Sequence, residues 1–382
     1  MKIVHLTTDE KFIDGAMFIF NKAFPKQNKL FVLKSPANPP FRFIRQSQID
    51  AEIVKSGKSL AEVKTLTGDA DWIVIHGLNE TWARFILENT KQNILYVVWG
   101  AEVYGNPLLY NKPLYGKYTE KLARQLNKKS FTQKLKDVIN TYRFNLPRLG
   151  KEQQWKLNKQ AFQKLRYISV IYKEEIDFYK ENNIVSNNAK FIKFGYYPIE
   201  YITKDIDEEV ALGTNIMIGN SSSLSNNHLE VLYKLKKLEV KNKILVPLSY
   251  GDKRLSKHIK RTGEDLFGSQ FKAITKFMPL NEYTTLMQSC GIVIMNHYRQ
   301  QAVGNIITAM YLGAKVFLDE RNTIYRYLKR IGSYIYSINE IKSETDLEIL
   351  SKHQIEKNRK ILIKQISENV LVNELRQQLA EG

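Results

Sequence analysis

Small polar residues follow a short apolar run in the stretch IMIGNSSSLSNNH, residues 216–228. The apolar run predicts a strand, and the apolar spacing after residue 228 predicts a helix. A helix N-terminus offers unpaired backbone N–H groups and a positive dipole end, so this junction can bind an anion, typically phosphate. The alternative is an ordinary loop in which Ser225 or Asn226 caps the helix. His228 could contact phosphate or merely cap the same helix.

Three further polar clusters follow predicted strands in the same part of the chain. Residues 246–251, VPLSYG, include an aromatic ring that could stack on a base, and residues 299–305, RQQAVGN, supply a cation, amides and a glycine before a predicted helix. Residues 318–322, LDERN, include an acid that either binds ribose or is only a surface charge. The carboxyl ends of parallel strands lie at one edge of a sheet, so the four clusters together predict a nucleotide-binding edge. The residues assigned to it are Gly219, Asn220, Ser221, Asn226, His228, Tyr250, Arg299, Gln300, Gln301, Gly304, Asn305 and Glu320.

The candidates for acid–base chemistry lie at predicted strand ends in the first third of the chain. Glu102 follows one strand end, and its carboxylate is the leading candidate for a general base that deprotonates a substrate hydroxyl. The alternative is a hydrogen-bonded loop acid. Asp9 and Asp14, in the loop after the first predicted strand, are rival bases. His76 ends another strand, where it either faces the substrate or is a structural cap.

Short strands alternate with helical patterns in both halves of the chain, which favours parallel sheets with helices on both faces. The predicted strands are 2–6, 30–33, 72–75, 94–98, 167–171, 190–194, 215–218, 244–246, 271–274, 292–295 and 315–318. An acidic, turn-rich stretch at 198–212 predicts a linker. With 382 residues, the simplest architecture is two doubly wound α/β domains with a cleft between them. We expect domains at 1–200 and 213–343, followed by a helical tail at 344–382.

The formal net charge of +19 predicts an anionic partner: nucleic acid, an anionic membrane surface or a phosphorylated substrate. Residues 111–166 carry fifteen Lys and Arg against three acids, with aromatic residues between them. One interpretation is a plain solvated helical face. The other, which we favour, is a basic helical insertion in the first domain that docks on the anionic inner leaflet, with Tyr115, Tyr118, Trp155 or Phe162 at the headgroups.

The composition is that of a soluble globular protein, with 43% hydrophobic and 25% charged residues. No apolar run approaches the length of a membrane span, and the N-terminus lacks the features of a signal peptide. The single cysteine, Cys290, excludes an internal disulfide and fits a reducing cytoplasm. Because it lies between an amphipathic stretch and a strand, we expect a buried structural thiol.

The order of four segments resembles the bacterial 4-acetamido-4,6-dideoxy-D-galactose (Fuc4NAc) transferases, also called TDP-N-acetylfucosamine:lipid II N-acetylfucosaminyltransferases. These segments are GNS…SNNH, VPLSYG, LMQSCGIVIMNHYRQQAVGNI and GAKVFLDERN. IHGLNETWARFIL and VVWGAEVYG, in the first half, also look like segments of that family, so the resemblance spans nearly the whole chain. The chain departs from the family in the length of 111–166, and Glu102 stands where the family tends to have Asp.

The resemblance implies a GT-B glycosyltransferase, with two Rossmann-like domains facing a cleft. It implies a dTDP-sugar donor in the C-terminal domain and a polyprenyl-diphosphate-linked saccharide acceptor at the N-terminal domain. We therefore expect a cytoplasmic enzyme of surface-polysaccharide assembly, peripheral on the inner face of the bacterial cell membrane. No DxD motif suggests a metal, and Arg299 with helix N-termini would suffice for a diphosphate, so no cofactor is expected.

Two alternatives remain open at this point. A GT-B transferase with a different nucleotide sugar or acceptor is the nearer one. The other is a basic nucleic-acid-binding protein, which would explain the charge but predicts base-stacking signatures such as RNP or KH motifs, and the sequence has none.

Overall fold

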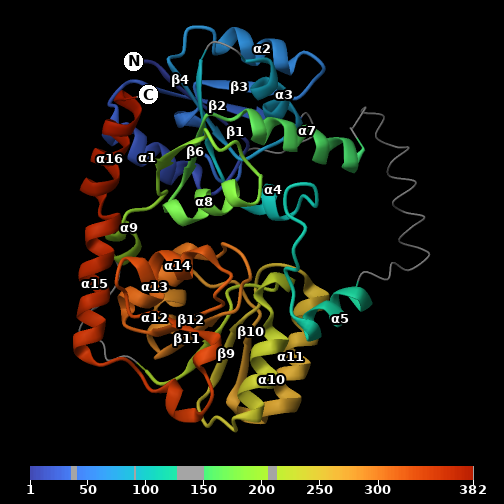
Figure 1. The fold of residues 1–382 in the computed structure, drawn as a ribbon, viewed down its shortest axis with the longest axis vertical. Helices are drawn as coiled ribbons and strands as arrows, with labels where there is room; N and C mark the ends of the chain where they lie inside the picture. The colour runs from blue at the N-terminus through green and yellow to red at the C-terminus, as the bar shows by residue number, and fades with distance from the viewer. Residues whose placement is uncertain (36–40, 90–91, 127–149, 205–212, 382) are drawn as a thin grey trace. The chain divides into compact units, whose positions relative to one another are not determined.

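The computed structural model describes residues 1–35, 41–89, 92–126, 150–204 and 213–381 (Figure 1). The chain forms two compact units, each built from segments that are distant in the sequence. The first unit comprises residues 1–111, 149–201 and 363–382, and the second comprises 112–148 and 202–362.

The first unit contains a parallel seven-stranded sheet in the order β3-β2-β1-β4-β5-β6-β7. The central strands β1 and β4 are buried along their whole length, which explains why their sequences are mostly apolar. The strands are β1 (Ile3–Thr7), β2 (Asn28–Lys34), β3 (Ala51–Val54), β4 (Trp72–His76), β5 (Asn93–Val97), β6 (Tyr167–Val170) and β7 (Lys190–Lys193). The helices are α1 (Ile13–Ala23), α2 (Ser59–Leu66), α3 (Glu80–Glu88), α4 (Ala101–Tyr104), α7 (Lys151–Lys164), α8 (Lys173–Glu181), α9 (Ile199–Thr203) and α16 (Glu368–Ala380).

The C-terminal helix α16 packs against α1, so the end of the chain completes the core of the first unit (Figure 1). Leu371 and Leu375 of α16 are buried in the same cluster as Phe20 of α1. The Arg376 Nε donates a hydrogen bond of 2.8 Å to the Ala23 carbonyl at the end of α1. The expected helical tail at 344–382 is therefore divided between the two units. Its residues 363–382, which include α16, belong to the first unit, and the residues before them belong to the second.

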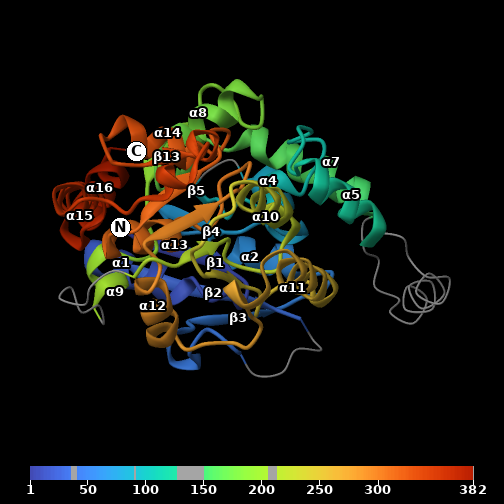
Figure 2. The ribbon, with the colours of Figure 1, turned by 90° about the horizontal axis from the view of Figure 1, so that it is seen from below.

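The second unit contains a parallel six-stranded sheet in the order β10-β9-β8-β11-β12-β13. Its strands are β8 (Ile216–Ile218), β9 (Ile244–Pro247), β10 (Phe271–Ile274), β11 (Ile292–Met295), β12 (Lys315–Leu318) and β13 (Tyr336–Ser337). Its helices are α5 (Lys117–Leu126), α10 (His228–Lys237), α11 (Lys253–Phe267), α12 (Leu280–Gln288), α13 (Val303–Leu312) and α14 (Thr323–Arg330), and α15 (Lys352–Ile366) leads out of it. Helices α10 and α11 lie side by side (Figure 2). Both sheets begin at an inner strand, build outward and then reverse direction, which is the doubly wound arrangement predicted from the sequence.

Helix α5 belongs to the second unit because a carboxylate of α10 holds its N-terminus. The Glu230 Oε1 accepts hydrogen bonds from the backbone N–H groups of Tyr118 (2.8 Å) and Thr119 (2.9 Å). Gly116 precedes this cap, and a Cβ atom at that position would lie 2.4 Å from the Glu230 Oε1. The basic stretch 111–166, expected as one insertion in the first domain, is therefore divided. Residues 112–126 lie with the second unit, 150–166 lie with the first, and 127–149 lie outside the described residues.

The structure also bears on three other expectations from the sequence: the buried cysteine, the linker and the lack of a membrane span. Cys290 is fully buried, and burial raises the pKa of its thiol to about 11, which confirms a structural thiol. The expected linker at 198–212 contains the short helix α9, and its residues 205–212 lie outside the described part of the chain. In the described ranges, every helix is too short or too polar to cross a membrane.

Candidate active site

The second sheet reverses its direction between β8 and β11, and ligands of doubly wound sheets bind at the carboxyl ends of strands at such a switch point. The loop at 219–227 follows β8, and the loop at 296–302 follows β11. The clusters around Tyr250 and Glu320 follow the adjacent strands β9 and β12. The structure therefore brings all four predicted polar clusters to one edge of one sheet.

Asn226 fixes the shape of the loop after β8. Its side chain is fully buried, its Oδ1 accepts the Asn220 N–H at 2.9 Å, and its Nδ2 donates to the Ser221 carbonyl at 3.0 Å. The same Oδ1 lies 2.9 Å from the His297 Nε2, in the loop after β11. Because this oxygen can only accept, His297 carries its proton on Nε2. Asn226 therefore joins the two loops of the switch point and presents no free amide to a ligand.

Gly219 permits this arrangement, because any larger residue would collide with it. Its φ of +66° lies in the left-handed region, which favours glycine. A Cβ atom at Gly219 would lie 2.5 Å from the Asn226 Oδ1 and 2.7 Å from the His228 Nε2.

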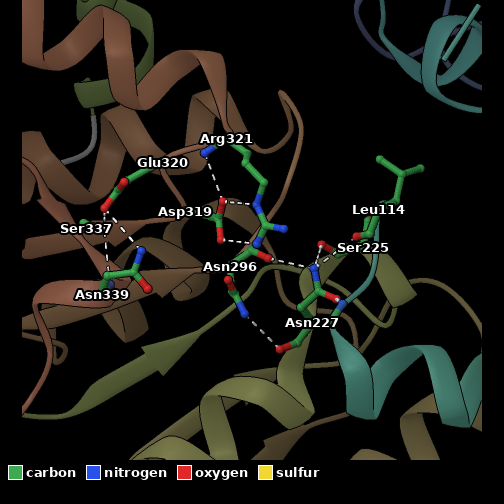
Figure 3. A network of polar contacts seen from close by, with 10 residues as sticks. Leu114, Ser225, Asn227, Asn296, Asp319, Glu320, Arg321, Ser337 and Asn339 are labelled. Carbon is green, nitrogen blue, oxygen red and sulfur yellow. Dashed lines mark hydrogen bonds and ion pairs between the residues drawn. The ribbon is translucent and has the colours of Figure 1, made fainter. Parts of the chain in front are cut away.

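Asn227 connects the same loop to the rest of the unit (Figure 3). Its Nδ2 donates to the carbonyls of Leu114 (3.2 Å), Ser225 (3.4 Å) and Asn296 (3.0 Å). The expected capping of α10 by Ser225 or Asn226 is wrong, because Asn227 takes the N-cap position and its side chain is used in these other bonds. The Ser225 Oγ donates instead to the Gln301 Oε1 at 2.6 Å, which forms a second link to the loop after β11.

His228 and His297 are neutral at this edge. They are 2% and 0% exposed, and burial lowers the pKa of each imidazole to about 3. With this pKa, His228 can therefore offer a phosphate a neutral hydrogen-bond donor. The sequence interpretation overlooked His297, although it lies just past a strand end, and a strand end was the signal that marked His76.

The predicted phosphate-binding loop leads into α13. Arg299 Nη1 donates to the Gln300 carbonyl at 2.9 Å, and Ala302 turns the chain into the helix with a left-handed φ of +58°. Gly304 and Asn305 lie in the first turn of α13. The space beside the Gly304 Cα is open, so a ligand can approach this helix N-terminus closely.

The other two clusters provide a ring and a set of charged groups. The Tyr250 side chain is 75% exposed after β9, as stacking on a base requires. Glu320 accepts hydrogen bonds from the Ser337 hydroxyl and from the Asn339 Nδ2 (3.3 Å), and these bonds lower its pKa (Figure 3). Next to it, Arg321 lies 3.3 Å from the centre of the Tyr298 ring and pairs with Asp319. The sequence interpretation did not identify that cation.

The predicted acids of the first unit are mostly engaged in its structure. Glu102 lies in the first turn of α4, and its Oε1 accepts from the Tyr96 hydroxyl at 2.7 Å and from the Trp99 N–H at 2.8 Å. The Asp9 carboxylate accepts the backbone N–H groups of three consecutive residues, Arg42, Phe43 and Ile44. Asp14 lies in the first turn of α1, and its Oδ1 is buried without a partner among the described residues.

His76 is 1% exposed, and its Nε2 lies 3.0 Å from the Nδ1 of His5. The His5 Nε2 faces the Asn28 Oδ1, which is an acceptor because the Asn28 Nδ2 donates to backbone carbonyls. His5 thus donates from Nε2 and accepts at Nδ1, so His76 donates from its Nε2. Burial lowers the pKa of His76 well below its ordinary value and that of His5 to about 4. The pair is neutral and His76 is buried, so a role facing the substrate stays a prediction.

An open cavity of about 340 Å³ lies at the carboxyl ends of β1 to β4 in the first sheet. It is lined by Thr8, Asp9, Glu10, Leu33, Ser35, Lys55 and Asn79. Of the four predicted acid–base residues, only Asp9 lines it. Glu10 was not selected from the sequence, although it lies beside Asp9 in the loop that leads to Asp14 and α1.

Comparison with solved structures identifies the architecture. HepE from Anabaena in complex with UDP matches with a TM-score of 0.63 and 10% identity, over 100% of both chains. Sucrose-phosphate synthase from Thermosynechococcus elongatus matches with a TM-score of 0.61 and 8% identity, over 100% of this chain and 99% of that one. A glycosyltransferase from Rickettsia africae matches with a TM-score of 0.60 and 11% identity, over 100% of this chain and 99% of that one. The expected fold is confirmed: the protein has the GT-B architecture of glycosyltransferases.

The family follows from residues 155–381, more than half of the chain, which match the model described as 4-alpha-L-fucosyltransferase glycosyl transferase group 56. The protein belongs to this family and is a glycosyltransferase. The match agrees with the resemblance to the Fuc4NAc transferases.

Proposed function

We propose that this glycosyltransferase moves a 4-acetamido-4,6-dideoxyhexose, Fuc4NAc or a close relative, from a dTDP-sugar to a polyprenyl-diphosphate-linked saccharide in surface-polysaccharide assembly. The family description supports a 6-deoxyhexose donor, since fucose is such a sugar. The motif order in the sequence supports the acetamido sugar and the lipid-linked acceptor.

The observation that carries the proposal is the convergence of four polar loops at the switch point of the second sheet. Arg299, Gly304 and Asn305 would bind the diphosphate together with the loop at 219–221, and Tyr250 and Glu320 would bind base and ribose. HepE, which shares the fold, is described in complexes with UDP, with UDP and glucose, and with UDP-glucose. Among the described residues, no three His, Cys, Asp or Glu side chains gather as a metal site. Independence from metal ions stays a prediction, tested by assaying transfer in excess chelator.

Arg299→Ala should weaken dTDP binding by about tenfold or more, because a charge-assisted hydrogen bond to a diphosphate contributes roughly 1.5–3 kcal/mol. Isothermal titration calorimetry with dTDP measures the change. The matched control is Arg261→Ala on α11, which removes an exposed arginine of the same unit away from the switch point. Equal dTDP affinity in Arg299→Ala and the control would remove Arg299 from the proposed site.

The runner-up is a transferase of the same fold that uses another nucleotide sugar. Titrating the wild-type protein with dTDP, UDP and GDP separates the two, because the proposal expects dTDP to bind most tightly. Tighter binding of UDP or GDP would replace the proposed donor and leave the glycosyltransferase class unchanged.

We also propose that the basic stretch docks the enzyme on an anionic membrane, where a lipid-linked acceptor would be found. Lys117, Lys121 and Arg124 are exposed on α5, so this part of the docking surface would belong to the second unit, not to the N-terminal domain expected from the sequence. Each basic residue near an anionic surface contributes about 1 kcal/mol.

Replacing Lys128, Lys129, Lys134 and Lys136 with serine should abolish co-sedimentation with anionic vesicles at moderate salt and leave dTDP binding unchanged. These four residues lie outside the described part of the chain. The control replaces Lys352, Lys357, Lys360 and Lys364 of α15, which removes the same charge elsewhere. Equal loss in both variants, or a wild-type protein that ignores anionic vesicles, would refute docking through the basic stretch.

A further inference from the structure

The cavity of the first unit occupies the position at which a doubly wound sheet binds its ligand. The first sheet reverses direction between β1 and β4, and the cavity lies at the carboxyl ends of these two strands and their neighbours β2 and β3. Its lining combines hydroxyls of Thr8 and Ser35, the Lys55 ammonium and carboxylates. Hydroxyls, a cation and acids suit a polyhydroxylated ligand, because each can form a directed hydrogen bond to a sugar hydroxyl.

Two carboxylates line this cavity, and they differ in how far the described residues already engage them. Asp9 uses both oxygens to hold the backbone of residues 42–44, so it organises the wall of the cavity. The Glu10 side chain is half-buried and has no hydrogen-bond or ion-pair partner among the residues that the structure describes. Glu102, Asp14 and His76 are not part of the lining.

The surroundings of Glu10 favour a proton acceptor. Burial raises the pKa of its carboxyl, the adjacent Asp9 raises it further, and Lys11 partly opposes both. Glu10 in turn contributes to the raised pKa of Tyr196, so the two groups are electrostatic neighbours. Lys55 is the cation that lines the same cavity from the strand β3 side. A carboxylate with a raised pKa is a stronger base than an exposed one.

We propose that this cavity holds the reacting hydroxyl of the acceptor saccharide and that the Glu10 carboxylate takes its proton. The inference rests on the proposed transfer to a sugar hydroxyl, and it does not depend on which nucleotide sugar is the donor. The acceptor oxygen forms a bond to the anomeric carbon of the donor sugar while its proton moves to Glu10. The bond from that carbon to the nucleoside diphosphate breaks, and its electron pair leaves with the diphosphate. A single displacement of this kind inverts the anomeric configuration.

The test compares steady-state transfer by the wild-type protein, Glu10→Gln, Glu10→Asp and Glu62→Gln, with whichever nucleotide sugar the wild type uses. Glu62 is the matched control, an exposed glutamate on α2 of the same unit that does not line the cavity. Glu10→Gln should lower kcat on the order of 10²–10⁴-fold, with the acceptor KM and the affinity for nucleotide nearly unchanged. Thermal unfolding reports whether each variant is folded.

Glu10→Asp keeps the carboxylate in a shifted position, so it should retain part of the activity that Glu10→Gln loses. Its activity should also still fall on acidification. Product NMR should show inversion at the anomeric carbon. The base assignment would be overturned by a Glu10→Gln variant within about threefold of the control, by a loss confined to the acceptor KM, or by retention of configuration. It would equally be overturned if Glu102→Gln lost turnover while Glu10→Gln kept it.

The donor proposal fails separately, if the wild type transfers a sugar from another nucleotide. In that case the ratio of the Glu10→Gln rate to the wild-type rate with that donor still decides the role of Glu10.

Discussion

Gly219→Ala should destabilise the second unit and weaken nucleotide binding by about tenfold or more. The weaker binding is expected because the substitution moves a loop that would donate charge-assisted hydrogen bonds to the diphosphate. The new Cβ atom would lie 2.5 Å from the Asn226 Oδ1, so Asn226 must move. Asn226 holds the N–H of Asn220 and contacts His297, so its displacement disturbs the loops after both β8 and β11. Backbone strain costs about 1–2 kcal/mol, and overpacking adds about 1–3 kcal/mol.

Gly332→Ala separates these two costs, because Gly332 also has a positive φ, +81°, but has open space where a Cβ atom would lie. It should show only the smaller loss from strain and bind dTDP like the wild type. Thermal unfolding and dTDP calorimetry on both variants measure the difference. If Gly219→Ala and Gly332→Ala behave alike in both assays, Asn226 does not organise the donor site.

Acidification from about pH 7 to about pH 4 should destabilise the protein strongly, because buried neutral histidines must gain a proton on unfolding. His5, His76, His228 and His297 are buried, and burial lowers the pKa of each. A lowered histidine pKa means that the unfolded chain binds protons which the native protein does not. Stability is therefore complete above the ordinary value of 6.5 and is lost as the pH falls through the window from 6.5 to about 4, the folded value of His5.

The size of this loss follows from the shift of His5 by about 2.5 pKa units, which corresponds to an upper value of about 3 kcal/mol at pH 4. The losses are not additive, because His297 is coupled to His228, and His76 to His5. The variant His297→Gln keeps a donor toward Asn226 and removes one titration, so its melting temperature should depend less steeply on pH. The exposed His258 and His353 provide the control, since replacing both with glutamine should leave the slope unchanged. An equal slope in the His297→Gln variant and the wild type would contradict the assignment.

Local patterns were sufficient to predict most of the two sheets. Strands such as β1, β4 and β11 are short and mostly apolar because both of their faces are buried, and this leaves a clear signal in the sequence. The strand β3 was missed, because only Ile53 of its four residues is buried and it lies at the edge of the sheet. The helix α16 was identified, but not its partner, since packing against α1 depends on residues more than 340 positions away in the sequence.

The candidate donor edge could be predicted for a topological reason, because parallel strands end at the same edge of a sheet. The side-chain partners within it could not. Asn226 looked like a helix cap or a ligand, whereas it is buried between two loops. The sequence also could not show that the Glu10 carboxylate can contact a ligand, because that depends on its side-chain partners. Asp9 and Glu10 share one loop, and Asp14 follows in the first turn of α1. Only the fold shows that Asp9 accepts backbone N–H groups of residues 42–44 and that Glu10 lines the cavity without such bonds from the described residues.

The most direct measurement of the proposed activity is mass spectrometry of lipid-linked products. The enzyme would be incubated with a polyprenyl-diphosphate-linked saccharide and, in parallel, with dTDP-4-acetamido-4,6-dideoxygalactose, dTDP-, UDP- and GDP-linked hexoses, and no donor. We expect the acceptor to gain the mass of one acetamido-dideoxyhexose residue only in the first reaction, and Arg299→Ala to reduce this product. An unmodified acceptor with the dTDP-acetamidosugar, together with product formation from a UDP- or GDP-sugar, would contradict the proposed donor.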